Sequence, residues 1–416
     1  MSQAAPAGPG TPATHWPAVL AAVAGGVAVG MNVGKVPLAL PTLRSELGLS
    51  LVQAGWVSSM LTTLAVVAAL GFGLAAGRVG ALRMVLGGLL LSALASLLAL
   101  RVGIDGTGLG LLLATRFVEG AGFIAVAVAA PALVSAAALP ADRRFALGVW
   151  STYMPAGAGL AMALSPLVLP GAGWRGLWAL TSGALLAAAL AAWWQRRWYA
   201  PAAASTHGVA PAAALAVLRQ PLPYLFAAGF GLWAVQHFAL IVWLPTMLKE
   251  QRGLSAGWVA LLTCAMLLAC VPGNLWGGML VQRGVSRGRM LALAHAATGL
   301  TSLAFFLDGL PDVARYAACV ACSFIGGVMP AAVMSSSAVL AKSPRQINAL
   351  QGLFMQGSQL GQFAGTPLIA AVVAASGRWS SAGWVSAGAA LCGVLVGLAA
   401  WRIEGQALPA TGRMAA

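Results

Sequence analysis

The chain has 416 residues, of which 60% are hydrophobic and only 7% are charged, and its mean hydropathy is +0.88. A soluble domain could not bury this much apolar surface, so these values exclude one. The formal net charge of +15 comes from basic residues scattered over short loops without a basic stripe, and it does not indicate nucleic-acid binding.

Twelve apolar stretches are each long enough to cross a hydrocarbon core, which takes about 20 residues of helix. A transmembrane barrel would show alternation with period two in shorter segments, and the stretches lack it. Helices are the spanning structure that remains. In chain order, the predicted spans cover residues 17–40, 52–73, 83–101, 109–138, 145–169, 176–195, 222–246, 257–281, 290–307, 313–340, 347–374 and 381–401.

Residues 196–221 mix basic, proline and small residues between the sixth and seventh spans. We predict a cytoplasmic linker there, between an N-terminal six-helix bundle at 17–195 and a C-terminal six-helix bundle at 222–402. Residues 1–16 are predicted to be a disordered cytoplasmic tail, and residues 403–416 a second cytoplasmic tail.

The two predicted bundles are similar in sequence when they are compared at an offset of 204 residues. This offset pairs Gly73 with Gly277, Gly80 with Gly284, Arg83 with Arg287, Pro140 with Pro344, Gly148 with Gly352 and Gly157 with Gly361. A parallel repeat of six plus six helices is the internal symmetry of one large class of transporters. The pattern therefore favours an all-α integral membrane protein built from two like bundles.

The distribution of basic residues predicts the orientation in the membrane, because Lys and Arg are enriched in cytoplasmic loops. With a cytoplasmic amino terminus, fourteen of the 23 basic residues fall in inner loops and the carboxyl tail, and seven fall in outer loops. The remaining two, Lys35 and Arg116, lie inside predicted spans. We therefore expect both termini of this multi-pass protein in the cytoplasm.

The sequence does not indicate an enzyme or a metal site. The five cysteines lie within spans, and the CxxC of Cys319 and Cys322 has no second pair and no histidine beside it. No cluster of His, Asp or Cys offers a nucleophile, a base or metal ligands, and no glycine-rich phosphate loop ends in Lys. We expect no cofactor, no metal and no catalytic residue.

The segment GLAAGRVGALR between the second and third spans resembles the loop motif of the major facilitator superfamily. Gly73, Arg78, Gly80 and Arg83 match that motif, and the resemblance assigns them to gating. The family's acidic position is occupied by Gly77, which removes a carboxylate that pairs across the cytoplasmic gate.

A second segment, RFVEGAG at 116–122 in the fourth span, is similar to another motif of the same family. The resemblance covers residues 17–402. It implies a membrane transporter with twelve helices, located in the plasma membrane, which in a bacterium is the inner membrane. It also implies alternating access by rocking of the two halves around a site near the middle of the membrane.

A narrower resemblance is to the cyanate and nitroimidazole permease-like branch. It depends on Asn32 with Lys35 in the first span, on WLP at 243–245 and on FMQG at 354–357. Branch members tend to carry Arg after the Asn, whereas this chain carries Lys three residues later. The branch therefore suggests a substrate class only loosely.

Ionisable residues inside the spans are the first candidates for a site, because a charge at mid-membrane costs about 2.5–3.5 kcal/mol on insertion scales. Arg116 and Glu119 lie three residues apart on one face of the fourth span. They form either a structural ion pair or a functional one. In the functional interpretation, Arg116 contributes positive potential to a central cavity and Glu119 couples transport to protons.

Lys35 follows Asn32 by three residues, so both lie on one side of the first span. Lys35 either extends toward the headgroups from near the end of its span or faces the cavity. In the cavity it would favour an anionic substrate, and Asn32 would add amide hydrogen bonds.

Neutral side chains within the spans are further candidates for substrate binding. Glutamines equally hold helices together by hydrogen bonds, and aromatic residues equally serve in packing. The candidates are Tyr153 in the fifth span, Gln236 and His237 in the seventh, and Phe354 and Gln359 in the eleventh, where Gln351, Gln356 and Gln362 also occur.

These observations favour a secondary active transporter for a small, anionic solute that works by alternating access, with proton coupling as an option. The alternative is a proton-driven efflux pump for amphipathic compounds, with which the aromatic and methionine content of the spans is compatible. The expected partners are a small-molecule substrate, a proton where coupling occurs, and the lipid bilayer. We expect a monomer.

Overall fold

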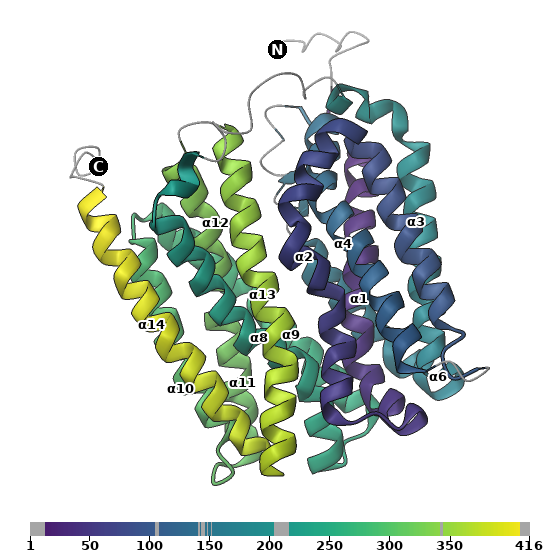
Figure 1. Ribbon diagram of the computed structural model, residues 1–416, viewed down its shortest axis with the longest axis vertical. Coiled ribbons are helices and arrows are strands. Elements are labelled where there is room, and N and C mark those ends of the chain that lie inside the picture. Colours follow the sequence, from purple (N-terminus) through teal and green to yellow (C-terminus); the bar gives the residue numbers. More distant parts are fainter. Residues whose placement is uncertain are drawn as a thin grey trace, which may run out of the picture.

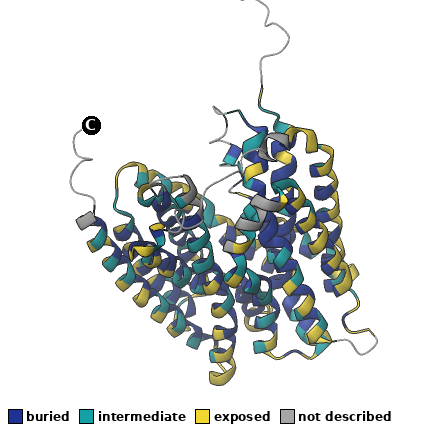
Figure 2. Cartoon of the chain, turned by 45° about the horizontal axis from the view of Figure 1, so that its top comes forward, coloured by how far each residue is buried: buried dark blue, intermediate teal, exposed yellow. Residues whose placement is uncertain are grey.

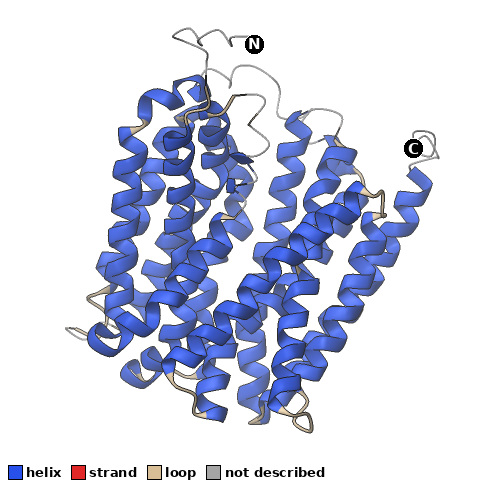
Figure 3. Ribbon diagram, turned by 180° about the vertical axis from the view of Figure 1, so that it is seen from behind, coloured by secondary structure: helices blue, strands red, loops and turns tan. Residues whose placement is uncertain are grey.

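The computed structural model of the protein describes residues 13–104, 108–139, 142, 146–147, 149–150, 152–203, 216–341 and 344–407. At residues 70, 73–78, 200–203, 338, 344–345, 347–348 and 406–407 within these ranges, only the backbone is described. All regular secondary structure in the described part is helical (Figure 3).

The helices divide into two groups along the chain. The first group is α1 Trp16–Leu47, α2 Leu51–Val79, α3 Ala81–Ala99, α4 Leu109–Ala137 and α6 Tyr153–Trp194. The second group is α8 Leu222–Arg252, α9 Ala256–Gln282, α10 Arg287–Phe306, α11 Asp312–Gly326, α12 Val328–Leu340, α13 Pro344–Ser376 and α14 Ala382–Ala407. Short 3-10 segments follow the first group and precede the second, η1 Arg196–Ala203 and η2 Ala216–Arg219, and η3 Trp379–Ser381 precedes α14.

These helices provide the twelve crossings that the sequence predicts. Within the described residues, nine segments are long and apolar enough to span a membrane. One of them, α6, contains a non-helical residue, Gly173 with φ 59° and ψ −165°, and so consists of two crossing helices. The other two crossings are α10 and α13, whose polar residues lower their mean hydropathy. The helices α11 and α12 together make one crossing.

Several helices continue beyond the apolar stretches that predict them. The first predicted span stops at residue 40, whereas α1 ends at Leu47, and α8 extends to Arg252 rather than to 246. The extra turns carry charged residues, which reach out of the hydrocarbon layer. The predicted linker has 3-10 helix at both of its ends, and its central residues 204–215 lie outside the described part. Residues 1–12 and 408–416 of the predicted tails also lie outside it.

The two groups form two bundles that stand side by side (Figure 1). In the N-terminal bundle, α1 packs against α6 and α3 against α4; in the C-terminal bundle, α8 packs against α13 and α10 against α14. The bundles meet where α2 contacts α13, α6 contacts α9 and α1 contacts α8. Exposed residues cover the outward faces of the bundles, and buried residues lie within them (Figure 2).

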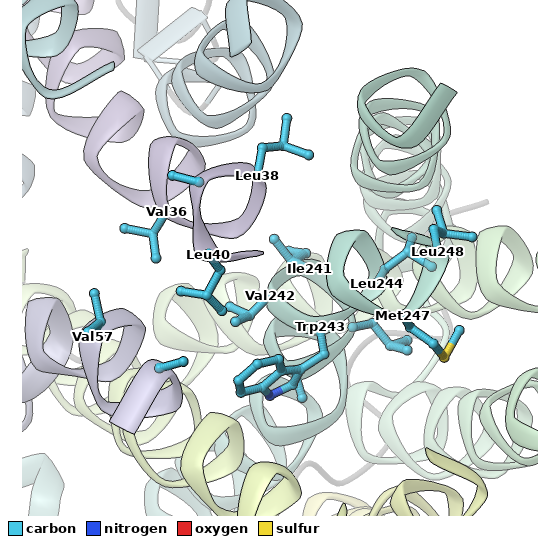
Figure 4. Close-up of a cluster of buried hydrophobic side chains, with 14 of the residues drawn as sticks. Val36, Leu38, Leu40, Val57, Ile241, Val242, Trp243, Leu244, Met247 and Leu248 are labelled. Carbon is cyan, nitrogen blue, oxygen red and sulfur yellow. The ribbon is translucent and has the colours of Figure 1, made fainter. Parts of the chain in front are cut away.

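Because the number of crossings is even, α1 begins and α14 ends at the same end of the molecule, as Figure 1 shows. We call this the terminal end and the other the far end. The far half contains one apolar core shared by both bundles. In it, Val36, Leu40 and Val57 of the N-terminal bundle face Val242 and Trp243 of α8 (Figure 4).

The terminal half contains a large apolar core in each bundle, with a small further cluster of Ala65, Ala69 and Ile124 in the N-terminal bundle. Leu89 and Leu133 belong to the N-terminal core, and Phe226 and Leu291 belong to the C-terminal core. The hydrophobic effect therefore holds the bundles together at the far end and not at the terminal end.

Candidate functional site

Lys35, Arg116 and Glu119 form a charged cluster inside the N-terminal bundle. Lys35 lies on α1, and the other two lie on α4. Their exposed fractions are 0%, 1% and 0%. Since charged groups in a hydrocarbon environment need partners, the fold must satisfy each of them internally.

Lys35 is satisfied completely by its neighbours. Its Nζ donates to Asn32 Oδ1 at 2.8 Å, to Ser96 Oγ at 2.9 Å and to Glu119 Oε1 at 2.8 Å. An ammonium group has three donors, so all of them are used. The Nζ also lies 4.4 Å from the centre of the Trp178 ring, at cation–π distance.

Glu119 accepts hydrogen bonds from three helices. Its Oε1 accepts from Lys35 of α1 and, at 2.5 Å, from Ser96 Oγ of α3, while its Oε2 pairs with Arg116 Nη1 one turn earlier on α4. The ion pair that the three-residue spacing predicts is therefore present, and Lys35 is a second cation on the same carboxylate.

Arg116 links the cluster to the space between the bundles. Its Nε donates to the Val57 carbonyl of α2 at 3.2 Å, and its Nη2 donates to the Asn32 carbonyl of α1 at 3.0 Å. With the Glu119 pair, these bonds use three of the five N–H donors of a guanidinium. One N–H on Nη1 and one on Nη2 have no partner among the described residues.

Arg116 also lines a cavity of about 30 Å³ between the two bundles, which is room for a water molecule or two. The other described residues that line it are uncharged. They are Val33, Val36, Ser58, Leu61 and Thr62 from the N-terminal bundle and Phe238, Val242, Gln362 and Thr366 from the C-terminal bundle. The Ser58 Oγ is buried and has no hydrogen-bond partner among the described residues.

The remaining candidates in the N-terminal bundle lie near this cluster or in the core. Asn32 holds Lys35 through its Oδ1, and its buried Nδ2 has no partner among the described residues. Tyr153 packs its ring on Trp150, with 4.5 Å between the ring centres, inside the terminal-half core.

Gln236, His237 and Phe354 of the C-terminal bundle do not line the cavity. Gln236 contacts His295 of α10, with 3.5 Å between Nε2 and Nδ1. His237 stacks on Trp233, with ring centres 4.8 Å apart, and Phe354 packs edge-on against Phe226.

Glutamines on α13 occupy different environments. Gln359 is buried, and its Oε1 has no partner among the described residues. Gln362 lines the cavity, whereas Gln351 donates to the Met334 carbonyl of α12. Gln356 donates to the Val66 carbonyl of α2 at 3.4 Å and so joins the bundles.

The candidate gating residues lie at the terminal end: Gly73 and Arg78 in the last turns of α2, Gly80 between the helices, and Arg83 in the first turn of α3. Gly80 has a φ of 93°, which favours glycine, and the repeat-related Gly284 has a φ of 78°. Arg83 is exposed. At Gly73 and Arg78 only the backbone is described, so the Arg78 side chain lies outside the described part.

The loop between α9 and α10, which the repeat relates to the loop between α2 and α3, has an acidic partner from a distant part of the sequence. The carboxylate of Glu404 on α14 accepts from Ser286 Oγ at 2.7 Å and from the Gly288 amide at 3.0 Å, and it pairs with Arg287 at 3.4 Å. Motif spacing could not reveal this contact, because 117 residues separate Arg287 from Glu404.

Two helical bundles that close on a shared cavity, with buried charges beside it, define a membrane transport protein. The family model described as "Major Facilitator Superfamily" matches residues 22–366. The chain belongs to this superfamily and has the fold of its transporters, not that of an enzyme.

Solved structures of a bacterial homolog of the human lysosomal transporter Spinster share this fold. The inward-facing, occupied form superposes with a TM-score of 0.77 at 13% identity and covers 96% of this chain and 98% of that one. The inward-facing, unoccupied form gives 0.74 at 14% identity, with 95% and 97% covered.

One curated relative matches over a shorter segment. It is the probable sulfoacetate transporter SauU of Cupriavidus necator, which is 38% identical over 79 residues. This segment makes up 19% of the present chain and 17% of that protein.

Proposed function

We propose that the protein is a secondary active transporter for a small anion and that Arg116 binds the substrate. The single observation that carries this proposal is that Arg116 lines the cavity between the bundles and has two N–H donors without a partner among the described residues, while the other described lining residues are uncharged. A guanidinium with two free N–H groups suits a carboxylate or a sulfonate, because both present paired oxygens.

The charge of the surroundings supports an anion over a cation. Lys35 and Arg116 contribute two positive charges against the one negative charge of Glu119. An anion in the cavity therefore meets an attractive potential, and the cavity, which now has room for one or two water molecules, must widen as the bundles move to admit it. In this proposal Lys35 contributes positive charge but does not contact the substrate, because its three donors are occupied.

Glu119 is the proposed site of proton coupling. It holds both cations of the cluster, so a change in its protonation changes the charge that Arg116 presents to the cavity. A proton on Glu119 and a negative charge in the cavity therefore favour each other, which is the coupling that a proton symporter needs.

The curated relative suggests which anions to test, and the orientation in the membrane suggests which side of the pathway is closed. The sulfoacetate named for the relative carries a carboxylate and a sulfonate, which makes small organic anions the first ligands to test. The loops and tails on the predicted cytoplasmic side carry fourteen of the 23 basic residues, and such a bias indicates that the terminal end is cytoplasmic. With the termini inside, the apolar core that both bundles share at the far end closes the outward side of the pathway in this conformation.

A binding screen on the purified protein tests the proposal. We expect methanesulfonate, sulfoacetate or small carboxylates to raise the unfolding temperature, because a ligand of the folded state stabilises it by mass action. Arg116→Gln should abolish the increase. Arg315→Gln is the matched control, because Arg315 is also buried but bonds the Phe305 carbonyl on α10, away from the cavity. Stabilisation by cationic dyes and by none of the anions would favour the efflux alternative.

A further inference from the structure

The charged cluster has a formal charge that depends on one proton. With Glu119 ionised, Lys35, Arg116 and Glu119 sum to one positive charge, and with Glu119 protonated they sum to two. All three side chains are at least 99% buried. A buried net charge without a counter-charge is costly, so a bound anion that supplies the missing negative charge is favoured.

No other charged group on the walls of the cavity alters this balance among the described residues. The neighbours of Glu119 are Lys35 from α1, Ser96 from α3 and Arg116 from α4, and Trp178 of α6 lies against Lys35. Across the cavity, α8 and α13 present uncharged side chains. The titratable His237 of α8 stacks on Trp233 and does not line the cavity.

We propose that the cluster matches the charge of its substrate and that this match decides whether a proton is carried. A monoanion neutralises the cluster while Glu119 stays ionised, so it binds without a proton. A dianion leaves one uncompensated negative charge unless Glu119 takes up one proton, so a dianion and a proton bind together. The inference rests on the proposed function and specifies the charge of the ligand at the same site.

Two sulfonates of fixed charge separate these cases, because neither changes its protonation near neutral pH. Titration calorimetry of the purified protein in two buffers of different ionisation enthalpy counts the protons taken up on binding. We expect no proton uptake with methanesulfonate and about one proton per methanedisulfonate, from the charge balance above.

Variants at two positions change the charge of the cluster without touching the cavity lining. Glu119→Gln fixes the charge of the cluster at plus two, so methanedisulfonate should bind this variant without proton uptake. Relative to methanesulfonate, its affinity should increase by about tenfold or more, within the range of couplings between linked sites. Lys35→Gln lowers the charge to zero with Glu119 ionised, and methanesulfonate binding should then require about one proton.

The outcomes distinguish the two proposals. If methanesulfonate binds and Arg116→Gln abolishes its binding, but methanedisulfonate binds the wild type without proton uptake, the charge-matching inference is wrong and the proposed function stands. If neither sulfonate binds the wild type, the charge-matching inference is wrong, and the proposed function is then decided by whether sulfoacetate or small carboxylates bind. Should Lys35→Gln fail to fold, the proton count on the wild type and on Glu119→Gln still decides the matter.

Discussion

Arg44 in the last turn of α1 forms an ion pair with Glu250 in the last turn of α8, at the far end of the molecule. Of the ion pairs among the described residues, this is the one that joins the two bundles. The two helices end alike, since Gly48 and Gly253 follow them with φ of 62° and 61°. The pair thus connects equivalent ends of the two repeats and closes the far end.

Glu250→Gln should increase the fraction of molecules that are open at the far end, while the closed state stays the more populated one. The two side chains are 26% and 42% exposed, and an exposed pair contributes about 0–1 kcal/mol, so the open fraction should rise by about fivefold at most. Spin labels at Gln53 and Gln251 would report a longer distance in the open state. Glu46→Gln is the control, because Glu46 pairs with Arg175 inside one bundle; an equal effect of both variants would contradict the role of the Arg44–Glu250 pair.

Glu119→Ala should destabilise the fold strongly, because it leaves two buried cations without their shared acceptor. Breaking a buried pair in this way typically costs about 3–5 kcal/mol. Glu119→Gln should cost less, since its amide oxygen still accepts from Lys35 or Ser96. Thermal unfolding in detergent measures both losses, and equal stabilities of the two variants would show that the acceptor role is unimportant.

Gly157 and Gly159 on α6 should respond differently to the same substitution. A Cβ on Gly157 would collide with the Val27 carbonyl of α1, whereas a Cβ on Gly159 finds its nearest neighbour, Leu268 Cδ2, at 3.8 Å. We expect Gly157→Ala to cost about 1–3 kcal/mol, as overpacking does, and Gly159→Ala to be nearly neutral. Unfolding temperatures of the two variants check this, and a neutral Gly157→Ala would show that α1 and α6 can separate without cost.

Glu404→Ala should weaken the start of α10, where this carboxylate caps the helix through the Gly288 amide and Ser286. Loss of a cap costs about 0.5–2 kcal/mol. Hydrogen exchange of the first turn of α10 should accelerate, while exchange at the start of α3, which Glu404 does not contact, should not change. Unchanged exchange at α10 would assign the cap to Ser286 alone.

The fold was predictable because the length of each apolar stretch and the placement of Lys and Arg between the stretches can be read from local sequence. The twelve crossings and the all-α class follow from hydrophobic length, whereas the superfamily was expected from the resemblance of two motifs; the structure and the family match agree with both. Helix ends were less predictable, because α1 and α8 continue as polar turns beyond the apolar residues.

The site was predictable only in part, since it depends on contacts between distant segments. The spacing predicts the Arg116–Glu119 pair. It cannot show that Glu119 also neutralises Lys35 from 84 residues away, or that Ser96 and Trp178 complete the cluster. The position of Gln362 on the cavity wall likewise depends on how α13 rotates against α2 and α8.

Uptake of radiolabelled methanesulfonate and sulfoacetate into proteoliposomes tests the central claim most directly, because these permanently charged anions do not cross lipid unaided. We predict saturable uptake of at least one of them by the wild type and by Arg315→Gln, and none by Arg116→Gln. Equal uptake by wild type and Arg116→Gln would contradict the claim that the buried positive cluster binds the transported anion.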